Sequence, residues 1–149
     1  MGAIYRCGLS PFVRPSTVYA CNEFEAKVHV TCYLESGEGS WYVDLANAPV
    51  EWYIDGRYVG TSMTDSLGWS YMRLHIAVPG RHIVKVVFRG LVVGDTEYRG
   101  DEAEYEIPVN LSPQVYSTLM LTCTSVAVLV VFAYFVLIAK ITAKISQIS

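Results

Sequence analysis

The C-terminal part of the chain contains an uncharged apolar run that can fold in few ways. Residues Thr118–Ala139 carry no charged side chain, and as a helix rising ~1.5 Å per residue they reach about 33 Å. That length matches a bilayer core of about 30 Å, and the run lacks the polar stripe of a helix that covers a soluble domain. The sequence therefore predicts one transmembrane helix over residues 118–139.

The charges divide the chain into an acidic part and a short basic tail. All 14 acidic and nine of the 11 basic side chains lie in residues 1–112, which argues against a nucleic-acid partner. Lys140 and Lys144 follow the apolar run, and basic residues beside a span prefer the cytoplasmic side. We therefore expect residues 1–112 outside the cytoplasm and residues 140–149 inside as a short, amphipathic tail. A cytoplasmic, tail-anchored adaptor is the alternative, because residues 1–20 make a poor signal peptide.

Residues 23–35 alternate strictly between apolar and polar side chains, as a half-buried strand does. Similar segments follow, separated by turn signals at Asp55-Gly56, residues 65–68 and residues 78–80. This pattern predicts an all-β sandwich of about seven antiparallel strands over residues 1–112, followed by a short joint at 113–117. The residues expected to face its core are Phe24, Ala26, Val28, Val30, Cys32, Leu34, Val50, Trp52, Ile54, Met72, Leu74, Ile76, Val84, Val86, Phe88, Ala103, Tyr105, Ile107 and Val109.

Several turn motifs fall between residues 47 and 107. The matching positions are Val50, Asp55, Gly56, Val59, Gly60, Thr64, Asp65, Gly68, Pro79, Gly80, His82 and Ile83. In these motifs the chain resembles the bacterial and archaeal Ig-like domains that repeat along cell-surface proteins, although it has one copy and lacks the Cys-Trp-Cys pattern of antibody domains. The resemblance implies an Ig-like sandwich acting as an extracytoplasmic spacer, adhesion or assembly module, with no catalytic residues to transfer.

The cysteines allow at most one bridge within residues 1–112. Cys21 and Cys32 lie on or beside the same predicted strand and cannot easily meet, so we expect Cys7 to pair with one of them if a disulfide forms. Cys123 lies in the predicted helix. Asn and Gln are scarce, a depletion that hints at a thermophilic source.

No sequence motif for an enzyme or a cofactor is present, so we expect a protein that is not an enzyme. A metal or redox site is a weaker hypothesis, because a spacing of three places His29 and Cys32 on opposite faces of a strand. We expect His29 and His75 to be solvated and Cys32 to lie in the core. The metal candidates are His29, Cys32, His75 and His82.

Three glutamates, Glu102, Glu104 and Glu106, share one face of the last predicted strand. We expect them to form a solvated, self-repelling edge, with a calcium site as the alternative.

Exposed aromatic residues and a polar stripe on the helix are the candidate contact surfaces. Tyrosine and tryptophan are frequent at interfaces, and glycan contact is an alternative use. The candidates are Trp41, Tyr42, Tyr53, Tyr58, Trp69 and Tyr71. Small hydroxyl residues often lie where membrane helices meet, although such hydroxyls also bond their own backbone. The helix-packing candidates are Thr118, Thr122 and Ser125, with Ile138, Ile141, Ile145 and Ile148 forming an apolar stripe.

Together these patterns indicate a single-pass membrane protein whose Ig-like domain has a structural or binding role. We expect an accessory subunit of a larger membrane or envelope assembly, in contact with lipid and with other subunits or copies of itself. A metal- or redox-handling subunit and a membrane protein of an enveloped virion are the alternatives.

Overall fold

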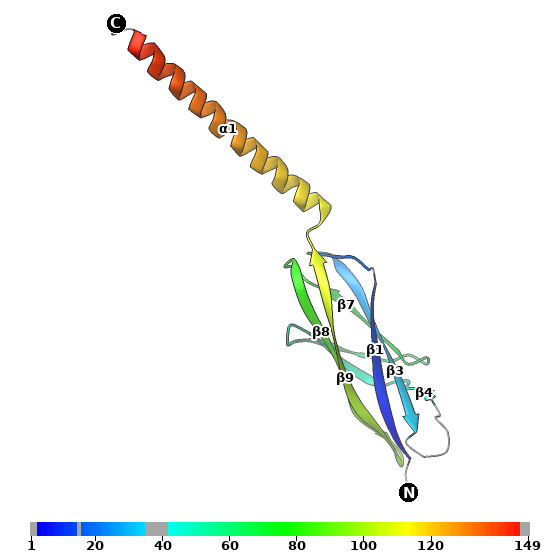
Figure 1. Ribbon diagram of the computed structural model, residues 1–149. Helices are drawn as coiled ribbons and strands as arrows, with labels where there is room; N and C mark the ends of the chain where they lie inside the picture. Colours follow the sequence, from blue (N-terminus) through cyan, green and yellow to red (C-terminus); the bar gives the residue numbers. More distant parts are fainter. Residues whose placement is uncertain (1–2, 15, 35–41, 147–149) are drawn as a thin grey trace. The chain divides into compact units, whose positions relative to one another are not determined.

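The computed structural model describes residues 3–14, 16–34 and 42–146, with side chains described as far as residue 138. The chain divides into two compact units, Met1–Asn110 and Leu111–Ser149 (Figure 1). The first is an Ig-like β-sandwich and the second is one long helix, as the sequence predicts.

The described residues form nine strands and one helix. They are β1 (Ile4–Arg14), β2 (Val18–Tyr19), β3 (Glu23–Leu34), β4 (Tyr42–Asp44), β5 (Pro49–Ile54), β6 (Arg57–Met63), β7 (Trp69–His75), β8 (Gly80–Val93), β9 (Thr96–Asn110) and α1 (Pro113–Ser146).

The strands build two layers that join along one side. In the first layer β3 pairs with β1 on one side and with β7 and β4, in line, on the other. In the second layer the order is β9, β8, β5 and β6. The layers meet where β1 pairs in parallel with β9, at Ile4–Arg6 and Glu97–Arg99. We call this side the closed rim and the opposite side, where β6 and β7 lie, the open rim.

The core lies between the two layers and follows the predicted alternation. Every residue expected to face inward is buried or half-buried, which confirms the prediction. Trp52 and Phe88 are the largest fully buried side chains. Trp52 also donates from Nε1 to the Ser62 hydroxyl at 2.8 Å, so its one polar atom is satisfied. Truncating such a residue to alanine costs about 3–5 kcal/mol.

The turns also follow their sequence signals. Asp55 and Gly56 both have positive φ, 49° and 77°, as a tight two-residue hairpin requires. Asp65 caps the next turn, since its Oδ1 accepts the N–H groups of Leu67 and Trp69 at 2.9 Å each. Gly68 closes that turn with φ 72°, where a Cβ would lie 2.8 Å from the carbonyl oxygen of Val30.

Strand β1 has no counterpart among the predicted strands. It pairs with β3 from Tyr5 opposite Leu34 to Arg14 opposite Glu25. The burial of β1 alternates along the strand except at Gly8, which is half-buried between Cys7 and Leu9. The hairpin of β8 and β9 is long and turns only after Val93.

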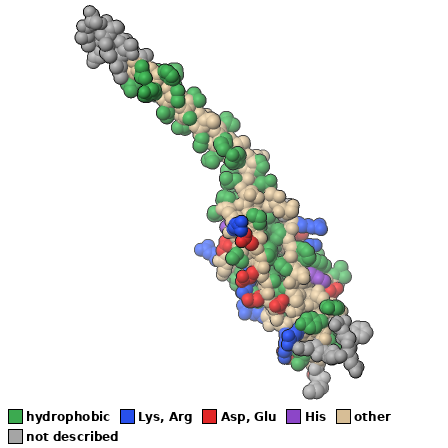
Figure 2. All heavy atoms as spheres, in the orientation of Figure 1, with side chains coloured by type: hydrophobic (Ala, Val, Ile, Leu, Met, Phe, Trp, Pro, Cys, Tyr) green, Lys and Arg blue, Asp and Glu red, His purple; other side chains and the backbone are tan. Residues whose placement is uncertain are grey.

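Helix α1 begins at Pro113, so the predicted joint at 113–117 is already helical. Proline suits the first position of a helix because its missing N–H would have no intrahelical acceptor there. Ser112 precedes it and accepts the N–H of Val115 at 3.3 Å. Residues Pro113–Ile138 form a helix long and apolar enough to cross a membrane. Figure 2 shows charged side chains gathered on the sandwich and apolar ones along the helix.

Candidate interaction surfaces

The outer face of the β1–β3–β7 layer carries a cluster that we call the aromatic face: Phe12, Lys27, His29, Trp69 and Tyr71. Strand register places Lys27 between Phe12 and Tyr71, and His29 beside Trp69. The rings of His29 and Trp69 stack with centroids 4.6 Å apart, and the Lys27 ammonium lies 4.2 Å from the centroid of the Trp69 ring. Phe12 and Tyr71 remain 50% and 45% exposed, so they are the accessible part of the cluster.

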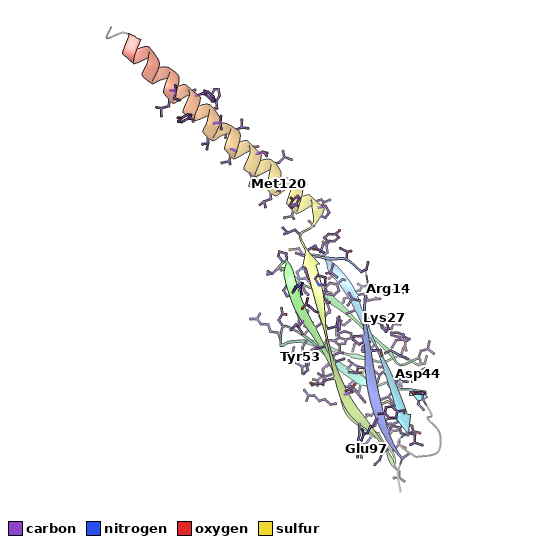
Figure 3. The ribbon with its side chains drawn as sticks, in the orientation of Figure 1. Arg14, Lys27, Asp44, Tyr53, Glu97 and Met120 are labelled. Carbon is purple, nitrogen blue, oxygen red and sulfur yellow. A yellow bond between two sulfur atoms is a disulfide. The ribbon has the colours of Figure 1, made fainter. Side chains whose placement is uncertain are left out.

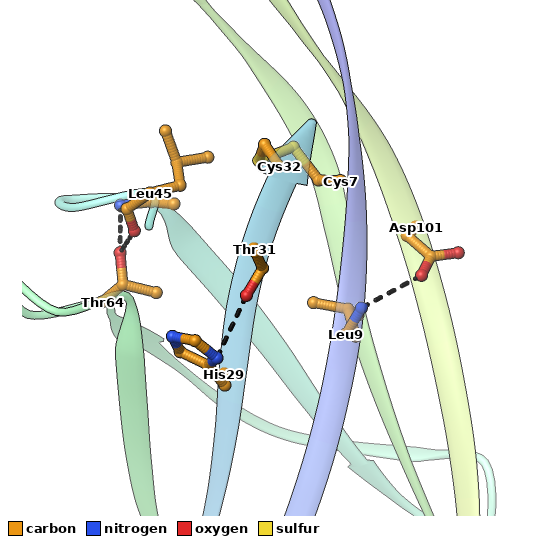
Figure 4. Close-up of a disulfide and its surroundings, with 9 residues drawn as sticks. Cys7, Leu9, His29, Thr31, Cys32, Leu45, Thr64 and Asp101 are labelled. Atoms are coloured by element: carbon orange, nitrogen blue, oxygen red, sulfur yellow. Dashed lines mark hydrogen bonds between the residues drawn. A yellow bond between two sulfur atoms is a disulfide. The ribbon is translucent and has the colours of Figure 1, made fainter. Parts of the chain in front are cut away.

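His29 is held within this face by three polar contacts. Its Nε2 lies 3.0 Å from both Asp44 Oδ1 and the carbonyl oxygen of Leu67, and its Nδ1 lies 3.0 Å from the Thr31 hydroxyl (Figure 4). The prediction of a solvated His29 is therefore wrong, because the ring is half-buried against Trp69. It joins β3, β4 and the turn before β7.

The outer face of the β5–β8–β9 layer is charged instead. Arg89 donates from Nε and Nη2 to the two carboxylate oxygens of Glu51, at 2.7 and 2.8 Å, and the Tyr53 hydroxyl donates to Glu51 at 2.6 Å. Hydrogen bonds from Arg89 and then Tyr53 lower the pKa of Glu51 to about 2. The bond to Glu51 raises the pKa of Tyr53. We call this surface the charged face, and Figure 3 labels Tyr53 on it and Lys27 on the other layer.

The glutamates of β9 belong to the same charged face. The Lys85 ammonium lies 2.8 Å from Glu102 and 3.4 Å from Glu104, and Arg81 lies 2.8 Å from Glu106. The glutamates are solvated, as predicted, with side chains at least half exposed. The prediction that they repel one another as an edge is wrong, because each has a cation across the strand pair. The bond to Glu102 raises the pKa of Lys85.

The predicted aromatic interface is divided between the layers. Tyr53 and Tyr58 meet on the β5–β6 hairpin with ring centroids 5.6 Å apart. Trp69 and Tyr71 lie on the other layer, and Tyr42 projects from β4 with 72% of its surface exposed. Trp41 lies outside the described residues.

The metal candidates do not converge. Cys32 is bonded to Cys7, which is one of the two pairings that the sequence allows (Figure 4). His29, His75 and His82 lie on β3, β7 and β8. Within the described ranges no three histidine, cysteine or acidic side chains are grouped to hold a metal ion.

His82 has a role that the sequence analysis did not identify. Its Nδ1 lies 2.7 Å from Asp55 Oδ2 and its Nε2 lies 2.8 Å from the carbonyl oxygen of Val78. Both partners only accept hydrogen bonds, so the doubly protonated ring fits this position best. The bond to Asp55 raises the pKa of His82 and lowers that of Asp55. The sequence signal nearest to this contact is the Asp55-Gly56 turn, whose aspartate also accepts the N–H of Ile83 at 2.9 Å.

The hydroxyl groups of the helix bond their own backbone. Thr118 donates to the carbonyl of Gln114, Thr122 to those of Thr118 and Leu119, and Ser125 to that of Leu121. Ile138 is exposed. Ile141 and Ile145 lie on the helix with undescribed side chains, and Ile148 lies outside the described residues.

Comparison with known proteins supports the fold. No protein-family model and no curated protein matches the chain. Among solved structures, the solution structure of a CARDB domain from Pyrococcus furiosus is similar, with a TM-score of 0.50 and 13% identity over 75% of this chain and all of that one. A crystal structure of the same domain in complex with di-metal ions has a TM-score of 0.47 and 16% identity, over 74% of this chain and 96% of that one. At 13% identity the likeness to the solution structure shows the fold alone, an Ig-like sandwich.

Proposed function

We propose that this chain is a single-pass membrane protein whose Ig-like sandwich works outside the cytoplasm as a non-catalytic assembly or binding module. One observation carries the proposal: the chain contains both a β-sandwich and the apolar helix Pro113–Ile138. The side chains of this helix are exposed along its length. A solvated apolar helix of that size is costly in water, and a bilayer removes the cost.

The disulfide between Cys7 and Cys32 supports the orientation. Disulfides persist in oxidising compartments and are rare in the cytosol of mesophiles. Both cysteines belong to the buried core of the sandwich. Lys140 and Lys144 follow the apolar part of the helix and favour a cytoplasmic C-terminus. This orientation also places the sandwich outside the cytoplasm.

The surfaces support a role in assembly. Each outer face of the sandwich carries a cluster of side chains that contact one another. The aromatic face leaves Phe12 and Tyr71 accessible. Such aromatics are the residues that interfaces use most. The partners we propose are lipid around the helix, and other membrane subunits or copies of this chain beside the sandwich, as in an accessory subunit of a larger assembly.

A thiol-labelling experiment tests the orientation with a residue that the chain already contains. Cys21 is free and exposed on the sandwich. In intact cells a membrane-impermeant maleimide should label Cys21 and miss an added Ser149→Cys, and Cys21→Ser should abolish the label. Labelling of position 149 alone would place the sandwich in the cytoplasm and overturn the proposal. Release of the chain by alkaline carbonate would overturn the membrane helix itself.

A further inference from the structure

Strand β7 has an edge that no described strand covers. It pairs with β3 from Trp69 opposite His29 to His75 opposite Glu23, in seven consecutive steps without a register shift. Its other edge faces the open rim. The backbone N–H and C=O groups of such an edge are a template for another strand, and proteins usually protect it with charge, proline or a bulge.

The other exposed edges of the sandwich have the protection that β7 lacks. Strand β4 has three residues, and the pairing of β6 with β5 shifts register beside Val59. The arm of β8 beyond its pairing with β5 is interrupted at Gly90, whose φ is 98°. Strand β7 contains no proline and one permanently charged residue, Arg73. It is therefore a long, regular edge with little protection.

We propose that the edge of β7 pairs antiparallel with β7 of a second copy of this chain, which joins two β1–β3–β7 layers into one sheet. The inference rests on the proposed function, because anchoring in one membrane raises the effective concentration of copies. A two-fold axis at Met72 places Tyr71 of each copy opposite Arg73 of the other. The N–H and C=O groups of Trp69 stay bonded to Asp65 of their own chain, so the ladder covers the strand after Trp69.

The chemistry of this register favours a second copy as the occupant. Arg73 of each copy faces the Tyr71 ring of the other, an arrangement that contributes through cross-strand and cation–π contacts. No described residue forms an ion pair with Arg73, although Glu25 lies opposite it on β3. A shift of two residues toward the C-terminus would put Arg73 against itself. A shift the other way would put Tyr71 opposite itself and Arg73 opposite Trp69, whose backbone groups already bond Asp65.

Cross-linking of the full chain in mild detergent tests the register. In a Cys21→Ser/Cys123→Ala background, two differently tagged copies carry Tyr71→Cys and Arg73→Cys, respectively. Opposite residues of an antiparallel pair lie about 4.5–5.5 Å apart, within disulfide reach. We expect oxidation to join these two copies, and not Tyr71→Cys with His75→Cys or Tyr71→Cys with itself. Self-joining of Tyr71→Cys, or joining to a different polypeptide in native membranes, would overturn the proposal.

A charge exchange tests whether this edge holds the copies together. Tyr71→Lys places an ammonium opposite Arg73 of the second copy and should weaken dimerisation about tenfold or more, as measured by light scattering against concentration. Adding Arg73→Glu to the same chain should restore the dimer. A wild-type monomer, or a dimer unaffected by Tyr71→Lys, would overturn the inference. Labelling of Cys21 from outside the cell would still succeed in that case, so the proposed function would stand.

Discussion

The two rims of the sandwich are closed in different ways. At the closed rim, backbone hydrogen bonds join β1 to β9, and the disulfide from Cys7 to Cys32 fixes β1 to β3 nearby. At the open rim, β6 and β7 are held by side chains, such as the hydroxyls of Ser62 and Ser70 and the methyl end of Met72 over Gly60. The closed rim therefore depends on long-range covalent and backbone links, whereas the open rim depends on local side-chain fit and keeps a free edge.

Among the changes that test this comparison, removal of the disulfide should lower the free energy of unfolding most. It links residues separated by 25 positions, and cross-linking a loop of that size stabilises a domain by about 3.5 kcal/mol in the chain-entropy description. Cys7→Ala/Cys32→Ala should lower the free energy of unfolding by that amount in denaturant titrations. Cys21→Ser is the matched control, because Cys21 is free. An equal loss in both variants would show that the closed rim does not depend on the covalent link.

The close approach of β8 and β9 at the closed rim should give the next largest effect. A Cβ on Gly100 would overlap the carbonyl oxygen of Phe88 and the backbone of Arg89. Gly100→Ala should therefore cost up to about 3 kcal/mol, as forced overpacking does. At Gly8, a Cβ would meet only the carbonyl of Thr31, at 3.9 Å. Gly8→Ala should be nearly neutral in the same thermal unfolding assay, and a comparable loss there would contradict the steric explanation.

A buried threonine provides the corresponding test at the open rim. Thr64 is 3% exposed; its hydroxyl donates to the carbonyl of Leu45 and accepts the N–H of Ala48 at 2.8 Å. Thr64→Val keeps the shape but leaves both backbone groups unpaired, which should cost about 2 kcal/mol. The exposed Thr61→Val on β6 is the control, with little expected change. If Thr64→Val were neutral, the loop before β7 would not depend on this link.

The difference between the rims also explains what the sequence could predict. The buried faces and the turns at Asp55 and Asp65 follow from local alternation and turn chemistry, and both were found. Strand β1 was missed because Gly8 and Pro11 interrupt its pattern. Its parallel pairing joins residues some 90 positions apart, and such a pairing has no local signal.

The candidate surfaces were predicted by residue type and not by arrangement. The outward positions of Tyr53 and Tyr71 follow from strand alternation, but their placement on different layers depends on which strands pair. Phe12 was missed together with β1. The ion pair between Glu51 and Arg89 joins residues 38 positions apart, so only the β5–β8 register brings them together.

The smallest predicted effect is a dependence of stability on pH at the His82 contact. The pKa of His82 is raised above its ordinary value of 6.5, mainly by the bond to Asp55, so its stabilisation is complete below pH 6.5 and is lost as pH rises through the raised pKa. The pKa of Asp55 is lowered from 3.8, so its contribution is present above pH 3.8 and is lost as pH falls through the lowered pKa. The contact should therefore stabilise the β5–β6 hairpin most between about pH 4 and pH 6.5.

Thermal unfolding of the wild type and of His82→Gln across that range and up to pH 9 measures this contribution. The difference between the two proteins should be greatest near pH 5 to 6 and should shrink above it. His75→Gln, at an exposed position on β7, is the matched control for replacing an imidazole by an amide. A difference that grows at alkaline pH would mean that the neutral ring is the favoured form. The contact of His82 with Val78 and Asp55 would then require one of those acceptors to turn away.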